Sequence, residues 1–159
     1  MEKNYFPIFI DLSDKNIVVI GGGTIAGRRA ATLCDFAEHV CVIAPEISDQ
    51  VEKLVSDGKV LWIKDCYQSS YVENADLVVA ATDVPEVNHK VKEDCMRLEK
   101  EKNRKIFVSV ADDRSLCDFY FPGIVKTEDA VIGISSGGSP KHTKELRQKL
   151  EEILKKESQ

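Results

Sequence analysis

A glycine cluster near the start of the chain has residue types and spacing that suit phosphate binding. The run Gly21-Gly-Gly-Thr-Ile-Ala26 fits the pattern G-x-G-x-x-A and directly follows the β-branched run Ile17-Val-Val-Ile20. In this pattern Gly21 allows a tight turn, and Gly23 lets the backbone approach a pyrophosphate. Ala26 keeps the next helix close to the sheet, so that the first helical amides face the phosphates. The run therefore predicts a dinucleotide site, with a ligand-free strand–helix turn as the alternative.

Further polar residues stand where a bound dinucleotide would extend. Glu46 follows Gly23 by 46 − 23 = 23 residues, close to the spacing of about 20 at which an acid receives the ribose hydroxyls. Glu46 would also repel a 2′-phosphate, although an ordinary acid in the first turn of a helix is an equal interpretation. Thr82, in Ala80-Ala-Thr-Asp83, is a candidate contact to the ribose or nicotinamide half. For Asp83 we expect a helix cap instead.

Asp112 and Asp113 are the candidates for proton transfer. They follow the apolar run Ile106-Phe-Val-Ser-Val110, at the carboxyl edge of the predicted sheet. Two neighbouring carboxylates in a cleft disfavour double ionisation, which suits one of them to proton transfer. Turn formation and helix capping are equal alternatives for the pair.

A second turn with free amides precedes the last predicted helix. The junction Ser135-Ser-Gly-Gly-Ser-Pro140 offers these amides to an anion, and Lys141 and His142 stand beside it. Plain capping of the helix is as good an interpretation of the junction as ligand binding.

Apolar runs alternate with helical patterns along the whole chain. We expect strands over residues 17–20, 40–44, 60–63, 76–81, 106–110 and 130–135, and helices over 24–37, 46–56, 85–100 and 140–156. Such alternation predicts parallel βαβ units with right-handed crossovers. The expected fold is a single Rossmann-type α/β domain over residues 1–159, a doubly wound, mostly parallel sheet of about six strands with helices on both faces. Residues 111–129 are expected to form a long functional loop.

Composition excludes several classes of protein. Of 159 residues, 22 are Lys or Arg and 27 are Asp or Glu, giving a net charge of −5, while 43% are hydrophobic. These values describe a globular chain, and no apolar run is long enough to span a membrane. A net-acidic chain without a basic stripe is not expected to bind nucleic acid. The start of the chain also lacks the pattern of a secretory signal.

The five cysteines are expected to be reduced thiols. No two of them have CxxC spacing, and the three histidines do not stand beside them at the spacing of metal ligands. We therefore expect a cytoplasmic protein without a metal site.

Taken together, the segments resemble the precorrin-2 dehydrogenases of siroheme synthesis, which form the amino-terminal module of siroheme synthases. The resemblance runs in order over about residues 4–152, and its most specific motifs are Cys117-Asp-Phe-Tyr-Phe-Pro122 and Ile134-Ser-Ser-Gly-Gly138. The other matching segments are Tyr5–Leu12, Val18–Ala26 with Arg28–Ala30, Val42–Glu46, Ala80–Asp83 with Asn88, and Val110–Asp113.

This resemblance implies an NAD-dependent oxidation of precorrin-2 to sirohydrochlorin, with the catalytic aspartate of the family at Asp112. It implies NAD contacts at the glycine turn and after the second strand, namely at Gly21, Gly22, Gly23, Thr24, Ile25, Pro45 and Glu46. Thr82 remains a further candidate for the cofactor. Precorrin-2 carries many carboxylates, and the residues expected to receive them are Ser136, Gly137, Gly138 and Lys141.

Three other functions are compatible with parts of the pattern. Some relatives also insert iron, so a bifunctional dehydrogenase and ferrochelatase is one alternative, although no ligand set supports metal insertion here. A non-catalytic NAD-sensing module and an S-adenosylmethionine methyltransferase are the others. The motifs at Cys117–Pro122 and Ile134–Gly138 argue against the sensing module. The methyltransferase stays open, because it would also use a glycine turn and an acid after the second strand.

The end of the sequence departs from the family pattern in two ways. The turn Gly138-Ser-Pro140 is one residue shorter than the usual GGxSP of the family. Family members usually continue into a helical domain that contributes to dimerisation and to the tetrapyrrole cleft, whereas this sequence stops at Gln159. We expect this extension to be absent. A homodimer is left open, with contacts expected from the sheet edge and the Lys144–Lys156 helix.

Overall fold

The computed structural model describes residues 6–157, which divide into two compact units. The larger unit comprises residues 10–120, and the smaller comprises residues 121–157 with residues 6–9. The sequence pattern predicts one continuous domain, whereas the contacts of the described residues separate the segment that follows Tyr120. Tyr5, the first residue of one matching segment, lies outside the described residues.

The larger unit is built on a parallel sheet of five strands in the order β3-β2-β1-β4-β5. The strands are β1 (Asn16–Ile20), β2 (His39–Ile43), β3 (Leu61–Ile63), β4 (Leu77–Ala80) and β5 (Phe107–Val110). Ile20 pairs with both Ile43 and Ala80, and Ala80 pairs with Val110, so four strands end at the same level. This strand order is that of the Rossmann fold, which places ligands outside the carboxyl ends of the strands. The predicted fold class is confirmed.

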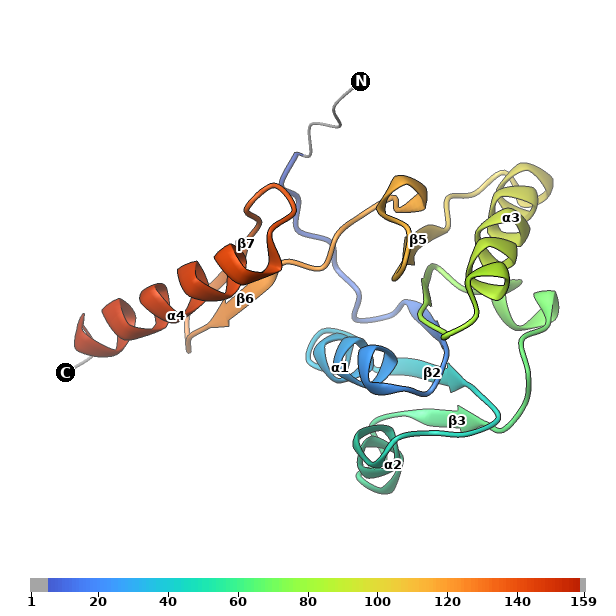
Figure 1. Ribbon diagram of the computed structural model, residues 1–159, viewed down its shortest axis with the longest axis horizontal. Helices are drawn as coiled ribbons and strands as arrows, with labels where there is room; N and C mark the ends of the chain where they lie inside the picture. Colours follow the sequence, from blue (N-terminus) through green and yellow to red (C-terminus); the bar gives the residue numbers. More distant parts are fainter. Residues whose placement is uncertain (1–5, 158–159) are drawn as a thin grey trace. The chain divides into compact units, whose positions relative to one another are not determined.

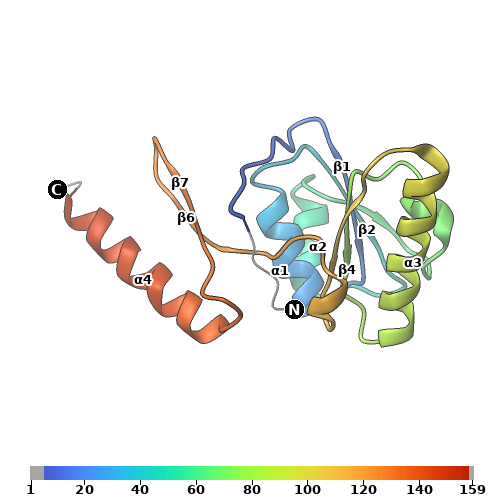
Figure 2. The ribbon, with the colours of Figure 1, turned by 90° about the horizontal axis from the view of Figure 1, so that it is seen from above.

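Helices cover both faces of this sheet. The helices α1 (Thr24–Leu33) and α2 (Asp49–Ser56) lie on one face, and α3 (Pro85–Lys102) lies on the other, as Figures 1 and 2 show. Two short 3-10 turns, η1 (Ser69–Val72) and η2 (Arg114–Leu116), complete the connections. Among residues 6–157, no helix combines the length and the apolar character that a membrane crossing requires.

The core lies where the central strands meet the helices. β4 is buried along its whole length, because helices cover both faces of a parallel sheet. On the α1 face, the small side chains of Ala26 and Ala30 are fully buried and let the helix approach the strands closely. On the α3 face, Val91 and Leu98 pack with Ile106 and the strand residues. The role predicted for Ala26 as a close helix–sheet contact is therefore confirmed.

The smaller unit contains a two-stranded antiparallel sheet and one helix. Its strands are β6 (Gly123–Lys126) and β7 (Val131–Ile134), and they pair with each other. A turn joins them, in which the Thr127 amide donates to the Ala130 carbonyl over 2.9 Å. The helix α4 (Pro140–Glu157) packs on β6, where a Cβ at Gly123 would lie 2.9 Å from Thr143 Cγ2.

Two sequence predictions about this region are wrong. Residues 130–135 do not form a sixth strand of the parallel sheet, because β7 pairs with β6 in a separate sheet. β6 itself lies within the stretch 111–129, for which the sequence pattern predicts a loop. The alternation of exposed and half-buried residues along β7 is typical of a hairpin with one solvated face rather than of a buried parallel strand.

Candidate functional site

The glycine turn follows β1, and two of its three glycines are required by the packing of the protein itself. Gly21 has a φ of +118°, and a Cβ at that position would lie 2.3 Å from the Ala81 carbonyl oxygen. A Cβ at Gly22 would lie 2.1 Å from the carbonyl oxygen of Glu46. Any side chain at either position would therefore collide with the backbone of a neighbouring loop.

Gly23 differs from the first two glycines. It is the N-cap residue of α1 with a φ of −79°, which any residue can adopt, and a Cβ there would meet no atom within 4 Å. Among the described residues, no side chain caps α1, and its first turn contains no acidic residue. Thr24 and Ile25 are exposed at the same helix end. The space above Gly23 and the amides of the first helical turn therefore suit a phosphate group.

The loop that carries Pro45 and Glu46 lies against this turn. The Ser48 amide donates to the Gly22 carbonyl over 2.8 Å, and Trp62 Nε1 donates to the Ala44 carbonyl over 2.9 Å. Pro45 and Glu46 themselves are exposed. The structure thus places the predicted ribose contact beside the glycine turn, with α2 beginning only at Asp49, three residues later than the sequence pattern predicts.

Thr82 follows β4 and is engaged by the loop that leads into α3. Its hydroxyl accepts from the Val84 amide over 3.2 Å and lies 2.8 Å from Asn88 Oδ1. Val84 is the N-cap residue of α3, and no side chain of the described residues caps this helix. The prediction that Asp83 caps the helix is therefore wrong, because Thr82 receives the amide instead. Thr82 stands at the predicted edge, but its hydroxyl belongs to this turn.

Asp112 follows β5 at the same edge and contacts a buried amide. Asn88 Nδ2 donates to Asp112 Oδ1 over 2.9 Å and to the Thr82 carbonyl over 3.1 Å. Asn88 is only 1% exposed, whereas Asp112 is exposed. The structure therefore brings together the loop after β4 and the predicted catalytic acid through one side chain of α3.

Asp113 has a different environment from its neighbour. Its Oδ1 accepts from the Ser115 amide over 2.9 Å and from the Ser115 hydroxyl over 2.6 Å, so that it caps η2. These hydrogen bonds, with a smaller contribution from His89, lower the pKa of the Asp113 carboxyl. His89 Nε2 lies 3.5 Å from Asp113 Oδ2. Asp113 thus has the turn and capping role that was the alternative for the pair. Asp112 takes no part in this cap.

The motif that begins at Cys117 holds the free edge of β5. The Val110 amide donates to Cys117 Sγ over 3.1 Å, and the Val108 amide donates to Asp118 Oδ2 over 2.9 Å. Lys92 Nζ, nearly buried on α3, pairs with Asp118 Oδ1 over 2.9 Å. Burial alone would raise the pKa of Asp118, but the hydrogen bonds from Lys92, Val108 and Lys105 outweigh it and lower the pKa. Cys117 and Asp118 therefore have structural roles that the sequence spacing did not suggest.

The residues predicted to receive substrate carboxylates lie in the smaller unit. Gly137 and Gly138 have φ values of +65° and +115°, and both are exposed, as is Lys141. Ser136 Oγ donates to the Ser139 carbonyl over 2.8 Å, and Ser139 Oγ accepts from the His142 amide over 3.2 Å. The serine hydroxyls thus shape the turn before α4, and the glycines leave its backbone open.

Sequence reasoning gave Asn88 no chemical role, although a signal for it exists. Val87, Val91 and Cys95 recur at helical spacing, and Asn88 stands among them on the buried face of α3. A polar side chain on such a face must find hydrogen-bond partners, which here include Asp112.

Among the described residues, no group of three or more His, Cys, Asp or Glu side chains could hold a metal ion.

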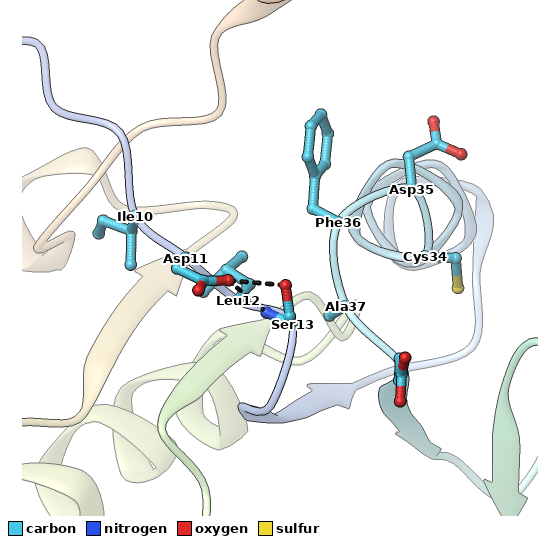
Figure 3. A pocket seen from close by; sticks show the side chains of 9 residues that line it. Ile10, Asp11, Leu12, Ser13, Cys34, Asp35, Phe36 and Ala37 are labelled. Atoms are coloured by element: carbon cyan, nitrogen blue, oxygen red, sulfur yellow. Dashed lines mark hydrogen bonds between the residues drawn. The ribbon is translucent and has the colours of Figure 1, made fainter.

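A pocket of about 390 Å³ lies elsewhere in the larger unit. It is lined by residues 10–13 and 34–38, which precede β1 and β2, so it opens at the amino ends of the strands rather than at the glycine turn. Figure 3 shows the Asp11 carboxylate bonded to the amide and the hydroxyl of Ser13. These bonds lower the pKa of Asp11. The pocket is therefore separate from the candidate site.

The strand order and the open glycine turn between β1 and α1 define a Rossmann-type nucleotide-binding domain. The chain belongs to an NAD(P)-binding family, NAD_binding_7, whose model matches residues 8–123. The matched stretch contains the glycine turn, Glu46, Asn88 and Asp112.

Comparisons with curated proteins and solved structures support the resemblance stated above. The chain is 38% identical over 156 residues to the siroheme synthase of Nitrosospira multiformis, a match that covers 95% of this chain and 32% of that protein. It is 38% identical over 152 residues to the siroheme synthase of Psychrobacter cryohalolentis, covering 95% and 28%. The chain thus spans about a third of the length of these curated relatives.

A solved structure named "SirC, precorrin-2 dehydrogenase" has a TM-score of 0.70 with this chain at 22% sequence identity. The match covers 94% of this chain and 71% of that one. It confirms the fold.

Proposed function

We propose that this chain binds NAD at the carboxyl edge of its parallel sheet and oxidises precorrin-2 to sirohydrochlorin. The proposal is supported by the similarity of 95% of the chain to proteins named siroheme synthase, and by the structural neighbour named precorrin-2 dehydrogenase. One observation carries it. The open position at Gly23 follows β1, and Asp112 follows β5. The ends of these two strands are at the same level, because Ala80 of β4, which lies between them, pairs with the last residue of each.

The residues present fit a dinucleotide. The turn Gly21–Gly23 and the amides of Thr24 and Ile25 would hold the pyrophosphate, because a helix N-terminus without a side-chain cap attracts an anion. The exposed Pro45 and Glu46 would contact the adenosine ribose. The loop at Thr82 would border the nicotinamide half. When bound, NAD supplies the acceptor for the hydride that leaves the substrate.

A side chain at the sheet edge would accept the proton that the substrate loses. Oxidation of precorrin-2 removes two hydrogens, one as a hydride and one as a proton, and Asp112 is the proposed general base for the proton. Its Oδ1 is engaged by Asn88, and its Oδ2 makes no hydrogen bond within residues 6–157. Oδ2 is therefore the oxygen that would take the proton.

The substrate contacts belong to the smaller unit. Precorrin-2 carries many carboxylates, and the exposed backbone at Gly137 and Gly138, with Ser136 and Lys141, would receive some of them. A cytoplasmic location and a homodimer are also proposed. The five free cysteines fit a reducing compartment, and light scattering on the purified protein would test the dimer.

Two measurements on the purified protein test the proposed function. Isothermal titration with NAD measures binding, and anaerobic incubation with precorrin-2 and NAD measures formation of sirohydrochlorin. Binding followed by turnover supports the dehydrogenase, whereas binding without turnover would support a non-catalytic NAD-sensing module. Adding ferrous ion to sirohydrochlorin under the same conditions tests the bifunctional alternative, for which we expect no insertion above the spontaneous rate.

A further inference from the structure

We infer that Asn88 is the positioning residue that fixes Asp112 relative to the glycine turn. The inference rests on the proposed function, because it assigns Asn88 a role in aiming the proposed general base. Asn88 lies in the first turns of α3 and is 1% exposed, so its side-chain amide must be satisfied by protein groups.

The orientation of the Asn88 amide is fixed by the backbone of Thr82. Asn88 Oδ1 lies 3.0 Å from the Thr82 amide nitrogen, which can only donate, and Asn88 Nδ2 lies 3.1 Å from the Thr82 carbonyl oxygen, which can only accept. Reversing the amide would bring two donors and two acceptors together. The group that faces Asp112 must therefore be the NH2, which gives its second hydrogen to Oδ1 over 2.9 Å.

A short chain of contacts links this amide to the glycine turn. A Cβ at Gly21 would lie 2.3 Å from the Ala81 carbonyl oxygen and 3.0 Å from the Thr82 nitrogen, so the turn lies directly against the loop that Asn88 holds. The loop, Asn88 and Asp112 thus form one continuous contact path from the cofactor turn to the acid. Because Asn88 is buried and its amide is fully bonded, it is the rigid member of this path.

The path has a consequence for Asp112. The exposed acid follows β5 without another hydrogen bond in the described residues, so the amide of Asn88 restrains its carboxylate through Oδ1 and leaves Oδ2 without a hydrogen bond. The ionisable chain neighbours of the pair are His89 on α3 and Asp113 before η2, which lie 3.5 Å from each other. Both stay unchanged in the variants proposed below.

Steady-state kinetics of Asn88→Ala and Asn88→Asp test the inference. For Asn88→Ala we expect kcat to fall about 10- to 100-fold, since misplacing a reacting group costs rate of this order, while the Kd for NAD changes by less than about twofold. Asn88→Asp has almost the shape of the wild type but would face Asp112 with a second carboxylate. Because one of the two would then hold a proton at neutral pH, the acid limb of its pH–rate profile should move to higher pH.

A matched control is Asn74→Asp, which makes the same chemical change at an exposed position in the turn before β4. It should keep the wild-type rate and pH profile. If Asn88→Ala fails to fold, the pH–rate profile of Asn88→Asp tests the inference instead. A folded variant at position 88 with wild-type kcat and an unmoved pH profile would overturn the inference.

A double-mutant cycle separates this inference from the proposed function. Urea unfolding of Asn88→Ala, Asp112→Ala and the double variant needs no substrate. We expect the losses in unfolding free energy of the two single variants not to add up to that of the double variant, since the two side chains share a hydrogen bond. Strictly additive losses would show that the side chains do not interact. If the wild type forms no sirohydrochlorin while the cycle shows coupling, the proposed function fails although the contact is real.

Discussion

The carbonyl oxygen of Glu46 lies so close to Gly22 that a Cβ at position 22 would be 2.1 Å from it. This contact explains a glycine that the dinucleotide pattern itself does not require, because position 22 is one of its variable positions. It also fixes the loop of Pro45 and Glu46 against the turn, together with the bond from the Ser48 amide to the Gly22 carbonyl. The acid proposed to select the cofactor is therefore held beside the proposed phosphate site.

Cofactor choice is the first prediction from this relationship. We expect NAD to be preferred over NADP, because the exposed Glu46 carboxylate would repel a 2′-phosphate and no arginine stands at positions 44–48 to receive one. Glu46→Arg should raise kcat/KM with NADP relative to NAD. The control is Glu52→Gln on the exposed face of α2, which should leave the ratio unchanged. Equal or better kcat/KM with NADP for the wild type would contradict the assignment.

The second prediction concerns the two neighbouring acids. Asp112→Asn should lower kcat by about 10²- to 10⁴-fold, the usual loss for a positioned base, and leave NAD binding nearly intact. Asp113→Asn should do far less, because an asparagine can still accept from the Ser115 amide and hydroxyl. Kinetic constants for both variants make the comparison. Similar losses in the two would show that the wrong acid has been assigned.

The third prediction separates the glycines of the turn. Gly23→Val should fold, at a cost of about 1 kcal/mol for a poor N-cap residue, because its side chain would meet no protein atom within 4 Å of Cβ. It should bind NAD at least tenfold more weakly, since the side chain fills the space left for the pyrophosphate. Gly22→Ala should instead lose stability, by roughly 1–3 kcal/mol or more. Calorimetric titration and urea unfolding measure the two effects, and unchanged NAD affinity in folded Gly23→Val would exclude this turn as the site.

The fourth prediction concerns acid stability. Since the folded pKa of Asp118 lies below its unfolded value of about 3.9, its contribution to stability is present above that pH and is lost as the pH falls through the folded pKa. Asp118→Asn should cost of the order of 3 kcal/mol at neutral pH, because Lys92 loses its partner. Its unfolding free energy should also change less between neutral and acid pH. Asp57→Asn, at an exposed position, should keep the wild-type slope, and an equal slope in Asp118→Asn would rule out this ion pair as the cause.

Much of the larger unit could be predicted from the sequence. Continuous apolar runs such as Leu77–Ala80 indicate buried parallel strands, and the glycine turn indicates their order and the edge that binds a nucleotide. The ends of the elements do not follow from apolar spacing alone. α1 stops at Leu33 instead of residue 37, because the amides of Asp35 and Phe36 donate to carbonyls only three residues back, at Thr32 and Leu33, a local geometry that apolar spacing does not encode.

The remaining errors have physical causes in particular residues. β6 offers only Ile124 and Val125 between Gly123 and Lys126, too short an apolar pattern to predict a strand. β7 contains apolar residues like those of a buried strand, and only its partner determines that it forms a hairpin. The contact between Asn88 and Asp112 joins residues 24 apart in sequence, so no local pattern could reveal it.

The proposed oxidation is followed by the absorbance of reduced nicotinamide when the purified protein is mixed with precorrin-2 and NAD without oxygen. We predict a protein-dependent rise that equals the sirohydrochlorin formed, one for one, and that almost disappears in Asp112→Asn. A wild-type protein that binds NAD but produces no reduced nicotinamide above the protein-free rate would contradict the proposed dehydrogenase activity.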